Sequence, residues 1–149
     1  NTIRRLLELG VIPIVNENDT IATDEISVGD NDTLAAMCAC STQADLLVLL
    51  SDIDGLYTED PHKNRHAQLI PLVAEITPEI TKLADGEGSG LGTGGMVTKL
   101  HAARIAMEHG VDMVIANGAR PQKLYDIVAG RSGGTRFQGK KEHGREKQL

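Results

Sequence analysis

The sequence is almost without aromatic residues. Its 149 residues include one Phe, two Tyr and no Trp, although hydrophobic residues of all kinds make up 40%. Proteins that bind single-stranded nucleic acid stack its bases on aromatic side chains, so this mode of binding has almost no residues to use here. A core built from Leu, Ile, Val, Ala and Met is expected instead, in a chain the size of one domain.

The chain also lacks an excess of basic charge. It carries 15 Lys and Arg against 21 Asp and Glu, which gives a formal net charge of −6 at pH 7. Binding along a nucleic-acid backbone requires a basic face that neutralises many phosphates. We therefore expect no nucleic-acid partner, and any phosphate that is recognised should belong to a small ligand.

Cysteines and long apolar runs are equally scarce. The two cysteines, Cys38 and Cys40, are two positions apart in a helical stretch, where side chains do not face each other, so neither a disulfide nor a zinc framework is expected. The longest apolar runs, such as residues 46–50, fall far short of the roughly 20 residues that span a bilayer. We also expect no signal peptide. We expect a cytoplasmic protein without a membrane partner.

Short apolar runs alternate with helical patterns along the chain. This alternation predicts an α/β fold with a mainly parallel sheet covered by helices on both faces. Ligands in such folds bind at the carboxyl ends of the strands, where Ser51–Asp52 and Asn117–Gly118 are expected to lie. The predicted helices are 1–9, 33–40, 77–84, 96–109 and 121–130; the predicted strands are 11–16, 45–50, 112–116 and, as an edge strand, 134–137; residues 69–73 form an apolar link.

Glycine is concentrated in residues 86–99, GEGSGLGTGGMVTK, which hold six of the 16 glycines. A flexible linker is one explanation. A dinucleotide-binding G-x-G-x-x-G at Gly90, Gly92 and Gly95 is another, but that motif requires a strand immediately before it. A third explanation is a glycine loop that opens a helix, whose free amides and positive dipole end form an anion site. Lys99, one turn into the helix, would then add a positive charge beside the anion.

Carboxylates and amides are concentrated in the segments NEND (16–19) and VGDNDT (28–33). A solvated acidic loop explains them without any function. The alternative is a site in which Asp19 and Asn31 bind a polar substrate, while Asp32 orients lysines or a metal beside a transferring phosphate. Mg²⁺ suits such a site because it prefers one or two carboxylates together with phosphate oxygens. No Ser-His-Asp or Cys-His arrangement is evident.

Three segments of the sequence together resemble the glutamate 5-kinases, a group within the amino-acid kinase family. They are VIPIVNENDTIATDEISVGDNDTLAA, LLVLLSDIDGLYTEDP and GSGLGTGGMVTKLHAARIA, and the resemblance extends to about Phe137. It implies a three-layer α/β/α sandwich, present in part. Residues 1–137 would form the carboxyl-terminal portion of the kinase domain, with the nucleotide half and part of the glutamate site. Residues 138–149 contain few apolar residues, which predicts a disordered tail.

The resemblance implies ATP-dependent phosphorylation of the γ-carboxylate of L-glutamate, the first step of proline biosynthesis, with Mg²⁺. Asp19 and Asn31 would bind glutamate. ATP would bind Ser51, Asp52 and the run Thr93, Gly94, Gly95, Met96, Val97, Thr98 and Lys99. Asp32 would organise the catalytic lysines, of which Lys99 is one, and no residue is assigned as a metal ligand.

Other features follow from the same resemblance. It implies a homo-oligomer and proline as a candidate feedback inhibitor. Members of the family begin with a strand, a glycine-rich loop and a second catalytic lysine, which this chain does not contain. An inactive nucleotide-binding or regulatory module, or a kinase for another substrate, therefore stays an alternative, and NAD-dependent oxidoreduction is a more distant one.

Overall fold

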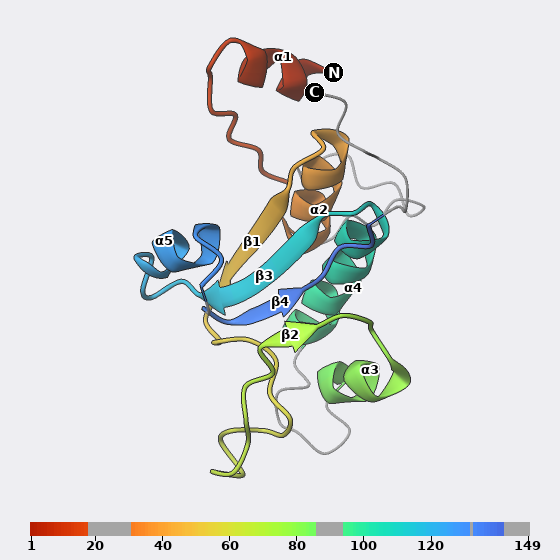
Figure 1. Cartoon of the computed structure of the whole chain (residues 1–149), viewed down its shortest axis with the longest axis vertical. Helices are drawn as coiled ribbons and strands as arrows, with labels where there is room; N and C mark the ends of the chain where they lie inside the picture. Colours follow the sequence, from red (N-terminus) through yellow and green to blue (C-terminus); the bar gives the residue numbers. More distant parts are fainter. Residues whose placement is uncertain (18–30, 86–93, 132, 142–149) are drawn as a thin grey trace.

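A computed structural model describes residues 1–17, 31–85, 94–131 and 133–141 (Figure 1). Its elements follow the predicted alternation, and the predicted helix ended by Gly10 is present as the first of them, with Asn1 as its N-cap. In chain order the elements are α1 (Thr2–Glu8), α2 (Asn31–Ser41), β1 (Leu46–Ser51), β2 (Leu72–Val73), α3 (Pro78–Asp85), α4 (Gly94–Glu108), β3 (Asp112–Asn117), α5 (Lys123–Val128) and β4 (Thr135–Phe137).

The strands form one sheet in the order β1-β3-β4-β2. The longest pairing is parallel and joins β1 to β3 over six residues, from Leu46 opposite Asp112 to Ser51 opposite Asn117. β4 pairs antiparallel with β3 and parallel with β2. The prediction of a mainly parallel sheet is confirmed. The prediction that 134–137 forms an edge strand is wrong, because β2, within the predicted apolar link, covers its outer side.

Helices lie on both faces of the sheet, as a three-layer α/β/α sandwich requires. Along β1 and β3 the side chains alternate between faces, as expected for strands with a period of two. Leu49, Met113 and Ile115 pack into the larger core cluster with α2 and α4. Val114 and Ala116 pack on the opposite face against Ile127 of α5. The α/β fold class is therefore confirmed, with α5 as a short second helical layer.

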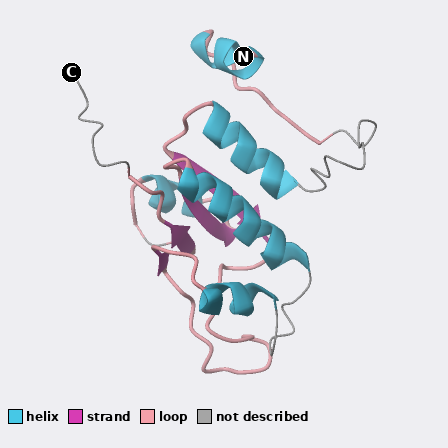
Figure 2. Cartoon of the chain, turned by 90° about the vertical axis from the view of Figure 1, so that its right-hand side faces the viewer, coloured by secondary structure: helices cyan, strands magenta, loops and turns pink. Residues whose placement is uncertain are grey.

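Small residues bring α2 and α4 together. Ala36 and Ala39 of α2 and Ala103 and Ala106 of α4 are buried in the same cluster, and interaxial distance in helix pairs depends on side-chain size at the contact. The helices lie beside each other in one layer (Figure 2). Each runs back along the strand that follows it, so both amino termini lie at the carboxyl edge of β1 and β3 (Figure 1).

Two further sequence predictions need correction. Residues 11–16 form no strand, and Ile12 and Ile14 are 86% and 95% exposed. An isolated strand leaves its backbone groups unpaired, and none of the described strands lies beside this segment. Part of the expected tail, residues 138–141, is also ordered. The amides of Gln138 and Lys140 bond to Val73 and Met107 carbonyls, so the ordered fold extends beyond residue 137. Residues 142–149 lie outside the described part.

Candidate functional site

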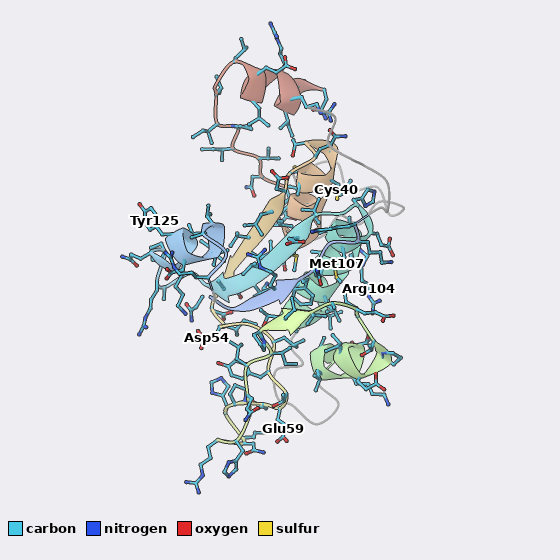
Figure 3. All side chains as sticks on the ribbon, in the orientation of Figure 1. Cys40, Asp54, Glu59, Arg104, Met107 and Tyr125 are labelled. Carbon is cyan, nitrogen blue, oxygen red and sulfur yellow. The ribbon has the colours of Figure 1, made fainter. Side chains whose placement is uncertain are left out.

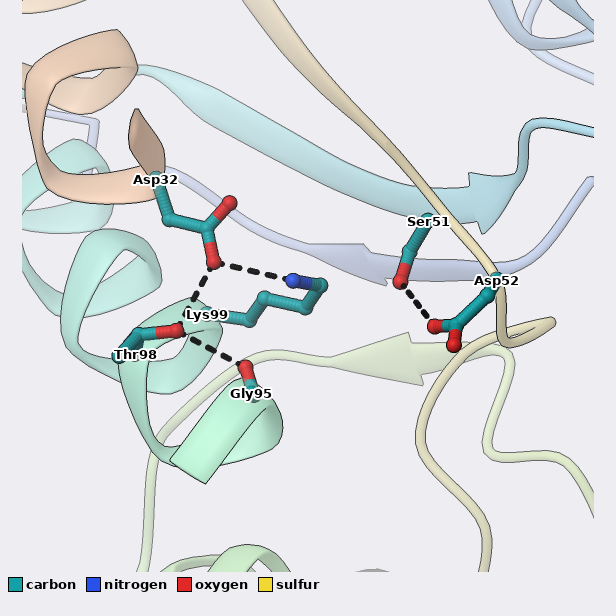
Figure 4. A network of polar contacts seen from close by, with 6 residues as sticks. All are labelled: Asp32, Ser51, Asp52, Gly95, Thr98 and Lys99. Atoms are coloured by element: carbon teal, nitrogen blue, oxygen red, sulfur yellow. Dashed lines mark hydrogen bonds and ion pairs between the residues drawn. The ribbon is translucent and has the colours of Figure 1, made fainter. Parts of the chain in front are cut away.

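An ion pair joins the amino-terminal turns of α2 and α4. The Lys99 Nζ lies 3.0 Å from the Asp32 Oδ2, and the side chains are only 13% and 20% exposed (Figure 4). The partly buried position reduces solvent screening relative to a surface pair. Asp32 is in the first turn of α2, where a carboxylate is also favoured by the helix dipole. The pair thus fixes a lysine ammonium group at the carboxyl edge of the sheet.

Thr98 supplies a second contact to the same carboxylate oxygen. Its Oγ1 is 2.9 Å from Asp32 Oδ2 and also 2.9 Å from the carbonyl oxygen of Gly95. A hydroxyl has one proton to donate, and a carboxylate is the stronger acceptor. We therefore assign the donated proton to Asp32. Both contacts that the described side chains make to Asp32 end on Oδ2, which fixes the orientation of the carboxyl group.

The amino terminus of α4 begins at Gly94, two residues before the predicted start of the helix. The first four amides of an α-helix, here those of Gly94 to Val97, have no partner within the helix. A Cβ placed on Gly95 would meet no atom of the described residues within 4 Å. The first turn of α4 therefore presents amide donors beside a space that no described residue fills, next to the Lys99 side chain.

The predicted glutamate-binding residues are only partly visible. The Asn31 Oδ1 accepts a hydrogen bond from the backbone amide of Glu17 at 3.4 Å, which links the end of the 11–17 segment to the start of α2. Asn31 itself is exposed and is next to Asp32 in the chain. Asp19 and Thr93 lie outside the described residues, so their predicted roles stay predictions.

Ser51 and Asp52 lie where β1 ends. The Ser51 hydroxyl donates to the Asp52 Oδ1 at 3.1 Å, and the Ser51 carbonyl accepts from the Gly118 amide at 2.7 Å. The second bond joins the end of β1 to the end of β3. In Figure 4 the Lys99 side chain points toward the side on which Ser51 and Asp52 lie. The two predicted parts of the nucleotide site therefore share one edge of the sheet.

A third group of polar residues at this edge includes Asn117, which lies at a strand end as predicted, and two residues that were not predicted at the site, Asp54 and Tyr57. The Asp54 carboxylate accepts from the Tyr57 hydroxyl at 3.0 Å and from the Asn117 side-chain amide at 3.1 Å. These two hydrogen bonds lower the pKa of Asp54, partial burial opposes them, and the charges of Lys123 and Arg120 lower it further. In Figure 3 Asp54 lies at the lower end of the sheet, far from Cys40, which lies near the upper end.

The sequence contains part of the signal for this group. Asp54 follows β1 by three positions and Asn117 ends β3, so a parallel pairing of these strands brings them to one edge. The sequence does not reveal the register in which β1 pairs with β3. Only the pairing of Ser51 with Asn117 places the Asn117 amide within reach of Asp54, 63 positions away in the chain.

Comparison with known proteins decides the family. The model of the amino acid kinase family matches residues 1–117, most of the chain. The chain belongs to this family. A solved isopentenyl phosphate kinase, 26% identical, superposes with a TM-score of 0.67 over 92% of this chain and 50% of its own. The uridylate kinase of Archaeoglobus fulgidus, 23% identical, shares the fold with a TM-score of 0.57 over 72% of this chain and 47% of its own.

Curated proteins similar to this chain include glutamate 5-kinases. The glutamate 5-kinase of Clostridium perfringens is 52% identical over 95% of this chain and 54% of its own length. That of Carboxydothermus hydrogenoformans is 54% identical over 99% of this chain and 40% of its own length. The chain therefore spans about half the length of the curated relatives it matches.

Proposed function

We propose that the protein carrying this chain is a glutamate 5-kinase, which transfers the γ-phosphate of ATP to the γ-carboxylate of L-glutamate in the first step of proline biosynthesis. The observation that carries the proposal is the Lys99–Asp32 pair beside the first turn of α4, in a chain whose relatives of that name are 52% and 54% identical. Cations and free amides are the groups that a phosphoryl-transfer site needs.

The chemistry of a carboxylate acceptor fits the residues at this edge. A glutamate γ-carboxyl, with an ordinary pKa of about 4.3, is already ionised at neutral pH, so no general base has to remove a proton. One carboxylate oxygen attacks the γ-phosphorus as the bond from that phosphorus to the ADP oxygen breaks, and the electron pair leaves with ADP. The enzyme has to bring two anions together and stabilise the charge on the transferring group.

Each predicted site residue at this edge of the sheet would have a part in this step. Lys99, with the amides of Gly94, Gly95, Met96 and Val97, would bind the terminal phosphates and stabilise the developing charge. Ser51 and Asp52 would bind another part of the nucleotide. Asp32 would act as a positioning residue that aims Lys99, since their contact is 3.0 Å long. Asn31, with Asp19, would bind glutamate.

Mg²⁺ is part of the proposal because ATP-dependent phosphoryl transfer uses it to neutralise phosphate charge. Among the described residues no group of three or more His, Cys, Asp or Glu side chains forms a metal site. That agrees with an ion held by one or two carboxylates and by phosphate oxygens of the nucleotide. Asp32 fits as such a carboxylate, because its contacts with described side chains occupy only Oδ2.

Three further features of the protein are proposed only from its sequence similarity to glutamate 5-kinases. We propose a cytoplasmic homo-oligomer that is inhibited by proline. Among the described helices none combines the length and the apolar character that crossing a membrane requires. Association and proline inhibition are measured by sedimentation and by a proline titration of the activity.

The test is ADP release by the full-length protein that carries these residues, with glutamate as acceptor. Isopentenyl phosphate and UMP serve as alternative acceptors, because an isopentenyl phosphate kinase and a uridylate kinase share the fold of this chain. ADP release that requires glutamate supports the proposal. Release that requires one of the other acceptors, or nucleotide binding without any turnover, would contradict it.

The Lys99→Ala variant tests the site itself in the same assay. We expect kcat to fall by a factor of about 10² to 10³, the usual effect of removing one donor that stabilises a transition state. Lys63→Ala is the matched control, because Lys63 is an exposed lysine in the loop between β1 and β2. Equal activity of the two variants would exclude the proposed role of Lys99.

A further inference from the structure

The Asp54 carboxylate joins two loops that are distant in the sequence. One loop follows β1 and holds Asp54 and Tyr57; the other follows β3, whose last residue is Asn117. Each Asp54 oxygen accepts one hydrogen bond, Oδ2 from the Tyr57 hydroxyl and Oδ1 from the Asn117 side-chain amide. One carboxylate therefore connects two polar groups, the Tyr57 hydroxyl of its own loop and the Asn117 amide at the end of β3.

The Asn117 side chain carries the connection further. Its amide nitrogen donates to Asp54, and its Oδ1 accepts from the backbone amide of Ala119 at 2.9 Å. This second bond fixes the turn that leaves β3, a typical use of an Asn side chain. The conformation of residues 117–119 thus depends on the orientation of one side-chain amide, and Asp54 determines that orientation.

The loop after β1 is anchored from the core as well. The buried Thr135 hydroxyl accepts from the Leu56 amide at 2.9 Å and donates to the Ile70 carbonyl at 2.7 Å. Gly55 approaches the same residue so closely that a Cβ at that position would lie 2.5 Å from the Thr135 hydroxyl oxygen. Asp54 therefore projects from a loop that the core holds in place, which makes it a fixed point for the more exposed loop after β3.

We propose that Asp54 is a positioning residue for nucleotide binding: through Asn117 it holds the loop after β3 in one arrangement against the end of β1, where Ser51 and Asp52 lie. The inference rests on the proposed ATP site and deepens it. Asp54 does not touch the nucleotide. It acts by fixing in advance the surface on which the nucleotide is bound, so that binding does not have to order the loop.

The experiment uses Asp54→Ala, Asn117→Ala and the double variant in the full-length protein. Each single change should raise the KM for ATP about tenfold, because a hydrogen bond to a charged group is lost. The KM for glutamate and kcat should change by less than about twofold, since the contacts of Lys99 are untouched. If Asp54 acts through Asn117, the double variant should be no worse than either single one.

Asp112→Asn is the matched control. Asp112 is the first residue of β3, whereas Asn117 is the last, and its carboxylate also accepts two hydrogen bonds, from Arg136 at 3.0 Å and the Gly139 amide at 2.8 Å. This variant should lower stability, as read from its melting temperature, without changing the KM for ATP. If the KM for ATP rises as much in Asp112→Asn as in Asp54→Ala, the rise comes from destabilisation of the whole fold. That result would overturn the inference.

Hydrogen exchange gives a readout that is independent of catalysis. In Asp54→Ala the Ala119 amide should exchange faster, because its acceptor on Asn117 is no longer held. Unchanged exchange together with an unchanged KM for ATP would refute the role of Asp54 while leaving the kinase proposal intact. Independent, additive effects of the two single variants on the KM would also refute it, because they would indicate direct contact of Asp54 with the nucleotide. Absence of nucleotide binding in the unmodified protein would remove both proposals.

Discussion

Two carboxylates at the same edge of the sheet have different partners and hence different roles. Asp32 meets a cation, Lys99, and a hydroxyl on one oxygen. Asp54 meets two neutral donors, one on each oxygen. The ion pair fixes the place of the charge that we propose acts on phosphate, whereas the two neutral hydrogen bonds fix the place of loops. At the scale of residues, both carboxylates position other groups: Asp32 positions a cation, and Asp54 positions neutral side chains of two loops.

The pKa of Asp54 reports its hydrogen bonds directly. It lies below the ordinary value chiefly because of the Tyr57 hydroxyl, and then because of Asn117. In Tyr57→Phe we expect this pKa to rise, as measured by carbon NMR of the labelled carboxyl group. Because the folded-state pKa is depressed, the contribution to stability is present above the unfolded pKa and is lost as pH falls through the folded one. An unchanged titration would contradict the hydrogen bond.

Thr98 offers a test of how Asp32 is oriented. Thr98→Val keeps the shape of the side chain but removes the hydroxyl that lies 2.9 Å from Asp32 Oδ2. We expect kcat to fall about tenfold, because a charge-assisted hydrogen bond is lost, while the KM for ATP changes little. Thr98→Ser should restore most of the activity. Equal activity of the Val and Ser variants would show that the hydroxyl has no part in the reaction.

At the scale of elements, two helices determine the site because of where they begin. The buried alanines of α2 and α4 allow the helices to pack side by side, and Asp32 and Lys99 near their amino-terminal ends then meet across 67 positions of sequence. The same first turn of α4 exposes its amides at the edge where β1 and β3 end. The site is thus a consequence of helix packing as much as of the glycines.

The Gly95→Ala variant separates the effect of this glycine on helix stability from its effect on ATP binding. An added methyl group meets no described atom, and Ala is a better helix former than Gly, so stability should stay the same or rise by up to about 1 kcal/mol. The KM for ATP should nevertheless rise, because the methyl group would occupy the space proposed for phosphate. Thermal denaturation and ATP titration measure the two effects, and an unchanged KM would argue against a phosphate at this turn.

Strong local patterns were enough to predict most elements, but not their partners. The apolar run of β1 and the helical pattern of α4 were predictable because periodicity and capping are local. Residues 11–16 have an equally apolar pattern yet form no strand, since a strand needs a neighbour that local pattern does not reveal. The Asp32–Lys99 pair was expected from family resemblance, whereas the Asp54 network required the strand register.

At the scale of the whole molecule, one sheet separates two apolar clusters of unequal size. The larger lies under α2 and α4 and includes Phe137, the single Phe of the chain, which is fully buried. The smaller lies under α5 around Ile127. Most of the hydrophobic stabilisation should therefore come from the face that also holds the two helix termini of the site, which links the stability of the fold to the geometry of the site.

Phe137→Ala tests this distribution of stability. Deleting a fully buried Phe side chain should lower the free energy of unfolding by about 3–5 kcal/mol, through lost burial and a cavity. Tyr125→Ala on α5 is the control, because Tyr125 is 79% exposed and should contribute little. Urea denaturation measures both, and similar losses in the two variants would contradict the assignment of the main core.

The most direct test is a crystal structure of the full-length protein with glutamate and a non-hydrolysable ATP analogue. We predict that the terminal phosphate oxygens accept hydrogen bonds of about 2.9 Å from the amides of the first turn of α4 and from the Lys99 ammonium group. The γ-phosphorus should face the glutamate carboxylate. Phosphates bound away from this turn, with Lys99 still paired only to Asp32, would contradict the account.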